Sequence, residues 1–317
     1  MMEINSFKYN IGLLSSYYRV LYRKLFNTSA PYGKVNGSRV IKKHHEANEV
    51  IGQMIDSGKP FMIGRFGSVE LSIIGESYKI LLGKQKSYPE RIIHIASNNA
   101  GIFLAEYDTL MRFSECMLQC AKDLDYIGLW NDKSELFTVK NFAPQAKGIE
   151  LWCLEPYYQL ENAWTHHLKG KKVLVVSPFA KSIESRFDHK QYLFDENFWP
   201  ECEWIPFQAV QTISGNKDDR FKTWFDALDY MISNIRNIDF DIAVIGCGAY
   251  GFPLASAIKN MGKQAIHLGG ATQILFGIRG KRWDDSELNV YFNEHWVYPG
   301  EDEKPKGLGK VENGCYW

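Results

Sequence analysis

The chain has 317 residues, of which 45% are hydrophobic and 23% charged, so it is long enough to bury a large core. Lysine and arginine together number 37, and aspartate and glutamate together also number 37. This balance excludes the general attraction to nucleic acid or to an anionic membrane that a strongly basic protein has, so any anion must be bound locally.

Targeting and redox signals are absent from the sequence. No apolar run approaches the roughly 20 residues that span a bilayer, and the first residues lack the pattern of a signal peptide. The six cysteines include no C-x-x-C pair, which argues against a disulfide framework or a structural zinc site. We therefore expect a cytoplasmic protein.

The first segment, residues 4–26, has apolar side chains near helical spacing with basic residues between them. This pattern predicts either a helix docked on the body or a helix at the inner face of the cell membrane. Residues 27–38 are rich in Gly, Ser and Asn and predict a linker. Residues 1–42 would then form an N-terminal helical arm and linker.

Residues 43–300 predict an α/β domain with halves of about 43–165 and 166–300. In the first half, buried strands are predicted within 61–66, 125–130 and 149–156, with helices between the first two. In the second half, strands are expected within 169–180 and 202–210, followed by a helix whose apolar residues hold a helical period from Phe221 to Ile235. The two halves predict two Rossmann-like layers around a cleft.

Residues 240–270 predict one strand–helix–strand unit with a glycine loop after its first strand. Gly246, Gly248 and Gly251 match G-x-G-x-x-G, with Ala249 and Tyr250 between them. Glycines let the backbone approach a phosphate, and the free N–H groups of the helix N-terminus favour an anion. The pattern predicts either a diphosphate site or a tight turn without a ligand.

The next strand disfavours a nicotinamide dinucleotide, because it ends in His267 and two glycines where an acidic residue should hold the ribose. Other polar or flexible residues near strand ends are candidates for contact with the nucleotide. They are Ser177, Lys181, Gly269, Gly270, Gln273, Arg279 and Arg282. Each has an alternative as an ordinary turn residue or a solvated charge.

Arginine and glutamate lie together where the strand 61–66 ends. Ser68 is a candidate helix N-cap, Gly67 provides the turn, and Glu70 lies in the first helical turn, where the helix dipole favours an acid. Arg65 needs more explanation, because an unpaired guanidinium is costly to bury. We expect it to pair with Glu70 or with a bound anion.

This junction resembles a motif of the GT-D type of bacterial glycosyltransferase, in which an early strand ends in R-[FI]-G-D-G-E-L. The matching residues are Arg65, Phe66, Gly67, Ser68, Val69, Glu70 and Leu71. The resemblance also covers 172–183, 240–270 and 273–283, and so spans about residues 45 to 285. It implies Rossmann-like parallel sheets flanked by helices in a GT-D-like architecture.

The resemblance also implies a chemistry. In that family an Asp-x-Glu pair is associated with a divalent cation and with the nucleotide diphosphate of a sugar donor, and the enzymes build cell-surface glycans. Glu70 matches the glutamate and would be a catalytic residue and metal ligand. Ser68 replaces the aspartate, and a neutral hydroxyl is a poorer ligand for a hard cation, which leaves dependence on Mn²⁺ or Mg²⁺ open.

We therefore expect a bacterial glycosyltransferase of the hexosyltransferase type. The donor would be a nucleotide-diphosphate sugar, with a UDP-sugar favoured, and the acceptor a glycan, a glycolipid or a protein-linked glycan in polysaccharide or glycoconjugate biosynthesis. The junction from Arg65 to Glu70, including Gly67 and Ser68, and the glycine loop would hold the donor diphosphate and oppose its growing charge. Glu155, beside two tyrosines, is the candidate general base. A nucleotide-binding oxidoreductase and a non-catalytic nucleotide-sugar-binding protein are the alternatives. Residues 301–317 predict a solvated tail whose last residues, Tyr316 and Trp317, fold back onto the body.

Overall fold

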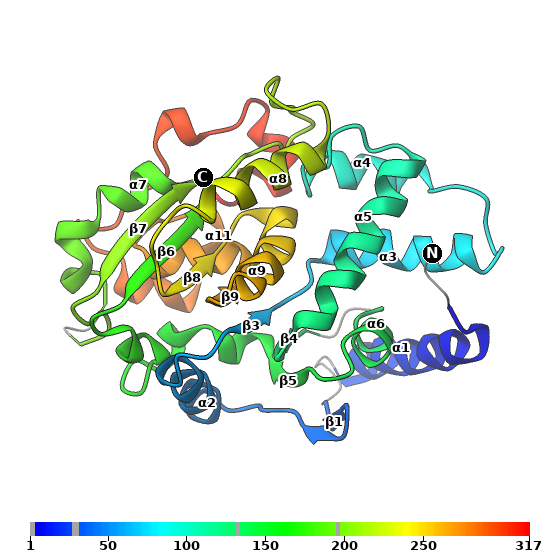
Figure 1. Ribbon diagram of the computed structural model, residues 1–317, viewed down its shortest axis with the longest axis horizontal. Coiled ribbons are helices and arrows are strands. Elements are labelled where there is room, and N and C mark those ends of the chain that lie inside the picture. Colours follow the sequence, from blue (N-terminus) through cyan, green and yellow to red (C-terminus); the bar gives the residue numbers. More distant parts are fainter. Residues whose placement is uncertain (1–3, 27–31, 131–133, 195–196) are drawn as a thin grey trace.

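The computed structural model describes residues 4–26, 32–130, 134–194 and 197–317. Its centre is a seven-stranded sheet with the order β5-β4-β3-β9-β8-β6-β7, in which all neighbouring strands are parallel (Figure 1). The strands are β3 (Phe61–Gly64), β4 (Tyr126–Leu129), β5 (Lys147–Glu150), β6 (Lys172–Ser177), β7 (Glu203–Gln208), β8 (Ile242–Ile245) and β9 (Gln264–His267).

The central strands are buried on both faces, as strands of a parallel sheet usually are. All four residues of β3, β8 and β9 are buried, and β6 is buried from Val173 onwards. Their apolar runs, such as Ile242–Ile245, lack the alternation of a strand with one wet face. Helices must therefore cover both sides of the sheet.

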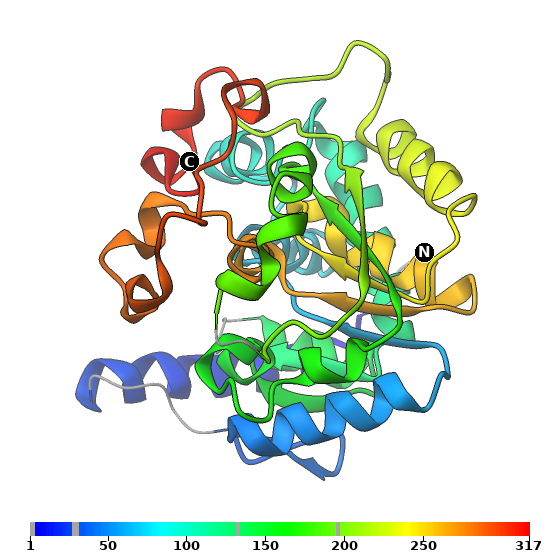
Figure 2. The ribbon, with the colours of Figure 1, turned by 90° about the vertical axis from the view of Figure 1, so that its left-hand side faces the viewer.

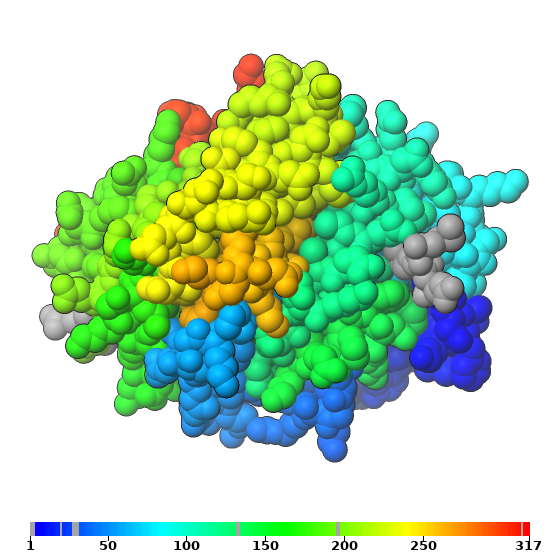
Figure 3. Space-filling model, viewed as in Figure 1, coloured from blue at the N-terminus to red at the C-terminus, as the bar shows by residue number. Residues whose placement is uncertain are grey.

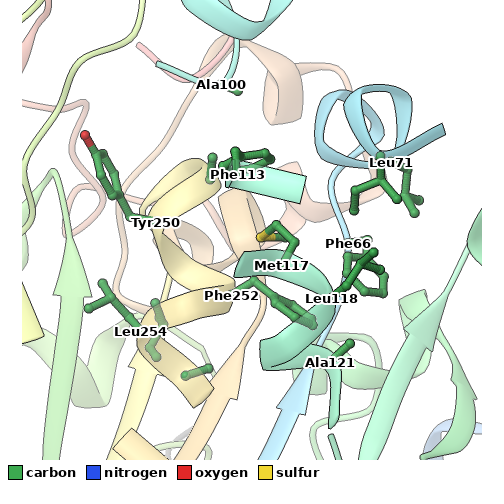
Figure 4. Packing of buried hydrophobic residues seen from close by; sticks show 14 of the residues in the cluster. Phe66, Leu71, Ala100, Phe113, Met117, Leu118, Ala121, Tyr250, Phe252 and Leu254 are labelled. Carbon is green, nitrogen blue, oxygen red and sulfur yellow. The ribbon is translucent and has the colours of Figure 1, made fainter. Parts of the chain in front are cut away.

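Two hydrophobic clusters lie on opposite faces of the sheet. The first is formed with α3 (Ser68–Leu81), α4 (Glu90–Asn98), α5 (Tyr107–Cys120), α6 (Glu135–Phe142), α8 (Trp224–Ile235) and α9 (Gly251–Asn260). The second is formed with α2 (His44–Asp56), α7 (Ala180–Glu184), α10 (Thr272–Leu275), α11 (Lys281–Asp284) and several 3₁₀ turns. Figure 4 shows the first cluster, where Phe66 stacks on Phe252 at 4.5 Å between ring centroids.

The two halves of the chain share one continuous sheet instead of forming two layers around a cleft. β9, from the second half, pairs with β3, from the first, through the register Phe61↔Gln264 to Ile63↔Ile266. The expected strand–helix–strand unit is present as β8, α9 and β9. The prediction of an α/β protein with a parallel sheet flanked by helices is confirmed.

Several local predictions need correction. Gly67, and not Ser68, is the N-cap of α3, and no side chain accepts the capping hydrogen bond. The strand predicted within 149–156 ends at Glu150 and continues as a 3₁₀ turn, because its partner strand β4 ends opposite this residue, at Leu129. Part of the expected linker forms the antiparallel hairpin of β1 (Lys34–Val35) and β2 (Ser38–Arg39), and residues 27–31 lie outside the described residues.

The two ends of the chain both pack on the body. The helix α1 (Ser6–Phe26) contacts α6 near the β5 side of the sheet (Figure 1). In the described part of the chain, no helix is both long and apolar enough to cross a bilayer. At the other end, Trp317 is buried and packs edge-to-face on Phe179, which confirms that the tail folds back.

Candidate functional site

The candidate site lies where the parallel strands end. The order β3-β9-β8-β6 places the segments after these four strands side by side at one edge of the sheet. The helices that follow β6 and β8, α7 and α9, lie on opposite faces of the sheet. Such a reversal opens a crevice beyond the strand ends, which is where ligands of open α/β sheets bind.

A pocket of about 120 Å³ occupies this crevice. Its walls come from six places in the chain: the end of α4, the segments after β6, β7, β8 and β9, and the C-terminal tail. Its aromatic side chains are Phe179, Tyr250, Tyr316 and Trp317. The polar side chains in its wall are Asn99, Gln211, Thr212 and Gln273.

The three glycines of the loop after β8 have different tasks. A Cβ on Gly246 would lie 2.5 Å from the carbonyl oxygen of Gly269, so this glycine lets two loops meet. A Cβ on Gly251 would lie 2.5 Å from the ring of His267, so this one allows α9 to pack on β9. Gly248 lines the pocket with φ +59 and open space beside it, the conformation that glycine adopts without strain. Of the three glycines, Gly248 is therefore the one with open space beside it in the pocket.

Two amide side chains present unpaired polar atoms near the pocket. Gln273 is 2% exposed, and its Nε2 donates to the carbonyl oxygen of Arg279 at 2.9 Å, which fixes the direction of its amide. Its Oε1 is buried and has no hydrogen-bond partner within the described residues. Nε2 of Gln211 is likewise buried without a partner among them. Buried polar atoms are normally satisfied, so these atoms suit a ligand with both donors and acceptors.

Arg65 lies beside the pocket on the other side of Gly269. Its guanidinium carbon is 4.8 Å from the centre of the Trp130 ring, and its Nη1 would be 3.4 Å from a Cβ on Gly269. Its Nε is buried, and in the described parts of the chain it has neither a hydrogen-bond partner nor an ion-paired carboxylate. The expected pair with Glu70 does not form. A cation that is half-buried and unpaired favours an anionic ligand.

Glu155 lies near Arg65 in the segment after β5. It is half-buried, and its Oε2 accepts a hydrogen bond of 2.5 Å from the hydroxyl of Tyr157. Burial raises the pKa of Glu155 to about 7, although the Tyr157 hydroxyl and the charge of Arg65 both favour the ionised form. A carboxyl group with a pKa near neutrality can accept and release a proton under physiological conditions.

His267 is a buried neighbour of Arg65 that carries no charge of its own. Its ring is 2% exposed and packs against Gly251. Burial, together with the nearby charge of Arg65, lowers the pKa of His267 to about 3, so the ring is neutral at neutral pH. The positive charge of this corner therefore resides on Arg65.

Glu70 is buried at the start of α3, where its carboxylate folds back against Gly67. It does not line the pocket that contains Gly248. The two residues nevertheless follow β3 and β8, which are separated only by β9, so both lie beyond strand ends at the same edge of the sheet. Ser68 is exposed in the first turn of the same helix.

A family model for a GT-D fold-like domain matches residues 42–275 of the chain. The chain belongs to the GT-D-like family. Membership of this family supports a glycosyltransferase in general. No curated protein matches the chain.

Two solved structures of a domain of unknown function, number 1792, resemble this fold. One is a selenomethionine-substituted structure with 13% sequence identity and a TM-score of 0.43. The other, described as having a distinct glycosyltransferase fold, has 12% identity and a TM-score of 0.44. Each similarity covers 83% of this chain and 92% of the other chain.

The structure of this GT-D-like protein brings together only some of the predicted site residues. Gly246, Gly248, Tyr250, Gly270 and Gln273 line the pocket, with Ala249 buried behind them. Arg65, Glu155 and Gly269 lie together in the neighbouring corner.

Four other predicted residues do not line the pocket. Ser177 is buried and accepts a hydrogen bond from the N–H of Phe179, while Lys181 forms an ion pair with Asp302 in the tail. Arg279 pairs with Asp284 at 3.0 Å. Arg282 donates to the hydroxyl of Tyr316 at 3.0 Å, so it reaches the pocket only through that ring.

Several residues of the site escaped the sequence interpretation. Trp130, Gln211 and Thr212 follow strands that were predicted, so the rule that ligands bind beyond the ends of parallel strands could have found them. Tyr157 was noted only as an aromatic neighbour of Glu155. Within the described residues, no three His, Cys, Asp or Glu side chains are grouped closely enough to hold a metal ion.

The distinct tasks of the loop glycines predict different effects on stability. Gly246→Ala should lower the free energy of unfolding by about 2–3 kcal/mol, because its Cβ would press on the backbone of Gly269. Gly248→Ala should cost about 1 kcal/mol, because it meets open space and only strains the backbone. Denaturant unfolding of both variants measures the difference, and equal losses would contradict these assignments.

Proposed function

We propose that the protein transfers a sugar from a nucleotide-diphosphate sugar, with a UDP-sugar favoured, to a hydroxyl of a glycan, lipid-linked or protein-linked acceptor. The product would enter a cell-surface polysaccharide or glycoconjugate. Family membership supports the glycosyltransferase class, and the geometry of the strand ends supports the donor. The observation that carries the proposal is the unpaired, half-buried Arg65 beside the glycine-lined pocket.

The nucleoside would occupy the pocket. Tyr316 offers a ring face on which a base can stack. Oε1 of Gln273 could accept from a ring N–H of the base, and the Gln211 amide could donate to a carbonyl oxygen. A uracil edge carries both kinds of group, which supports a uridine nucleotide as the donor. The tail residues would close the pocket over the base.

The diphosphate would cross the loop at Gly269 and Gly270 towards Arg65. Gly269 has a φ of +68 and contacts Arg65 on one side, while Gly270 lines the pocket on the other. Backbone N–H groups at these turns and the guanidinium would oppose the charge that grows on the leaving diphosphate. Because these donors are already in place, little reorganisation is needed as the glycosidic bond breaks.

Glu155 would act as the general base for the acceptor. Its carboxylate would take the proton of the acceptor hydroxyl while the hydroxyl oxygen attacks the anomeric carbon and the bond to the diphosphate breaks. With a pKa of about 7, a large fraction of the carboxyl group is ionised at neutral pH, and the carboxylate is still basic enough to take a proton. Trp152, which is 51% exposed in the preceding turn, offers a ring face to an acceptor sugar.

The described residues offer few ligands for a divalent cation. The exposed hydroxyl of Ser68 is a poor ligand for a hard cation, and the described residues include no cluster of three candidate ligands. Where Mn²⁺ or Mg²⁺ did bind, Glu70 would hold it, and it would add positive charge beside the diphosphate. The positive charge that the chain itself supplies comes from Arg65.

Donor specificity is tested by thermal unfolding with UDP-, GDP-, CMP- and dTDP-sugars. A UDP-sugar should raise the melting temperature most, since ligand at 100 times its Kd stabilises the native state by about 2.7 kcal/mol. Gly248→Val should remove the response by crowding the pocket. Gly262→Val is the matched control, because Gly262 also has positive φ and open space but lies beyond the far end of α9. No response to any donor would contradict the donor site.

Glu70→Gln should lower sugar transfer by at least about a hundredfold, because it removes the carboxylate that would hold a divalent cation beside the diphosphate, while the melting temperature stays close to that of the wild type. Its carboxylate is held at the start of α3, and the amide would fill the same space without charge. Product formation is measured with and without Mn²⁺, and Glu76→Gln on the same helix is the control. Unchanged turnover would remove Glu70 from the mechanism, and failure of the wild type to release nucleotide diphosphate would favour a non-catalytic binding protein.

The pH dependence of transfer tests the role of Glu155. The base must be ionised, so the rate of transfer should fall as the pH drops through about 7. Glu155→Gln should abolish this acidic limb of the pH–rate profile together with most of the activity. Tyr157→Phe removes a hydrogen bond that favours the ionised carboxylate, so the limb should move to higher pH. Tyr158→Phe changes the neighbouring ring and should leave the limb in place. An unmoved limb in Tyr157→Phe would exclude Glu155 as the titrating group.

A further inference from the structure

The helix α1 is attached to the body by one narrow face. Tyr9 packs edge-to-face on Tyr78 and Phe137, with ring centroids 6.0 and 5.4 Å apart. One turn further on, Gly12 lies close to the Phe137 ring, where a Cβ would be 2.8 Å from Cδ2. Near the other end, the guanidinium of Arg19 stacks on the ring of Tyr32 at 3.8 Å. These contacts fix which side of α1 faces outwards.

The outward side carries an apolar stripe. Its side chains recur at intervals of four and three residues, which keeps them within an arc of about 80° on a helix. Their exposed fractions range from 51% to 74%. They are Phe7, Ile11, Leu14, Tyr18, Leu21 and Leu25. An ordinary docked helix buries such a stripe against the core, whereas α1 turns it away from the core.

The surroundings of α1 leave this stripe open. Figure 2 shows α1 projecting beyond the body, and Figure 3 shows it at the rim of the molecule next to the first half of the chain. Tyr17 and Phe26 add further exposed rings beside the stripe. Of the exposed large apolar and aromatic side chains in the described residues, eight lie on this single helix. Exposed apolar patches of this kind mark interaction surfaces.

The charges of α1 indicate what covers the stripe. The helix contains Lys8, Arg19, Arg23 and Lys24 and no acidic residue. Lys8 and Lys24 lie about 100° to either side of the stripe, where long side chains can reach lipid headgroups while the stripe enters the acyl boundary. Apolar, aromatic and basic residues in this arrangement are typical of helices that lie in the interface of an anionic membrane.

A second copy of the chain would cover the stripe less well than an anionic membrane. The spacing of four and three residues would suit a coiled coil, whose flanking positions usually carry opposite charges. Here the flanking residues are Lys8, Asn10, Ser15, Tyr17, Tyr22 and Lys24, which include no acid. Two copies would bring cations together without partners. We therefore propose that α1 binds an anionic lipid surface through this stripe.

The attachment of α1 also connects it to the candidate site. The hydroxyl of Tyr32, under Arg19, donates to Oε2 of the buried Glu135 at 2.9 Å. The same oxygen accepts from the N–H of Trp130 at 3.1 Å, and the Trp130 ring contacts Arg65. A membrane under α1 would therefore lie on the β4 side of the strand ends. If the proposed sugar transfer holds, this position favours a lipid-linked acceptor.

Binding is tested by co-sedimentation of the full chain with vesicles of phosphatidylglycerol and phosphatidylcholine in equal parts. Leu14→Asp/Leu21→Asp should weaken partitioning at least about tenfold, because both residues lie in the stripe. Ile93→Asp/Val290→Asp makes the same charge change at exposed apolar residues elsewhere and should bind as the wild type does. Lys8→Gln/Lys24→Gln should weaken binding, as should pure phosphatidylcholine vesicles or high salt.

The melting temperatures of the variants establish that each is folded, and sedimentation without lipid measures the oligomeric state. Loss of vesicle binding in the stripe variant alone supports the proposal. Absence of wild-type binding overturns it, and so does equal binding of the stripe and control variants. A wild-type dimer that the stripe variant dissociates, without any vesicle binding, would assign the stripe to a second copy instead. None of these measurements depends on sugar transfer, so they stand apart from the proposed activity.

Discussion

The pairing of β9 with β3 is the contact on which the rest of the structure depends. It joins strands from the two halves of the chain, about two hundred residues apart, in one parallel sheet. Because all strands of this sheet point the same way, the pairing brings the arginine after β3 beside the glycines after β9. The close approach of Gly246 to Gly269 then adds the loop after β8. One strand pairing thus assembles the phosphate-binding part of the proposed site.

Most residues that shape the site are uncharged, and only a few of its polar groups lack a hydrogen-bond or ion-pair partner within the described residues. His267 and the buried glycines bring the backbones together, and the charged function is left to Arg65 and Glu155. Their separation from the pocket by a single glycine turn suggests a division of labour. The pocket would recognise the nucleoside, and the neighbouring corner would carry the reaction. In this arrangement specificity and catalysis can change independently.

Much of the fold could be predicted from the sequence, because its signals are local. The run Val173–Val176 and the strand–glycine loop–helix around Gly246 depend on neighbours in the chain, and both elements are present. Much of the site could not be predicted, because its contacts are long-range. Lys181 follows a strand end as expected, yet it pairs with Asp302 in the tail. For α1, the local pattern is consistent with an apolar stripe that faces either the body or a membrane, and only the tertiary contacts of Tyr9 and Arg19 turn it outwards.

The C-terminal tail contributes Val311, Tyr316 and Trp317 to the pocket, and Glu303 fastens it to α7 through the N–H of Lys181 at 2.9 Å. A ligand in the pocket and the docked tail therefore stabilise each other, and by thermodynamic reciprocity each strengthens the other by the same factor. Any change that loosens the tail should accelerate ligand escape. A bound ligand should correspondingly slow amide hydrogen exchange throughout the last residues of the chain.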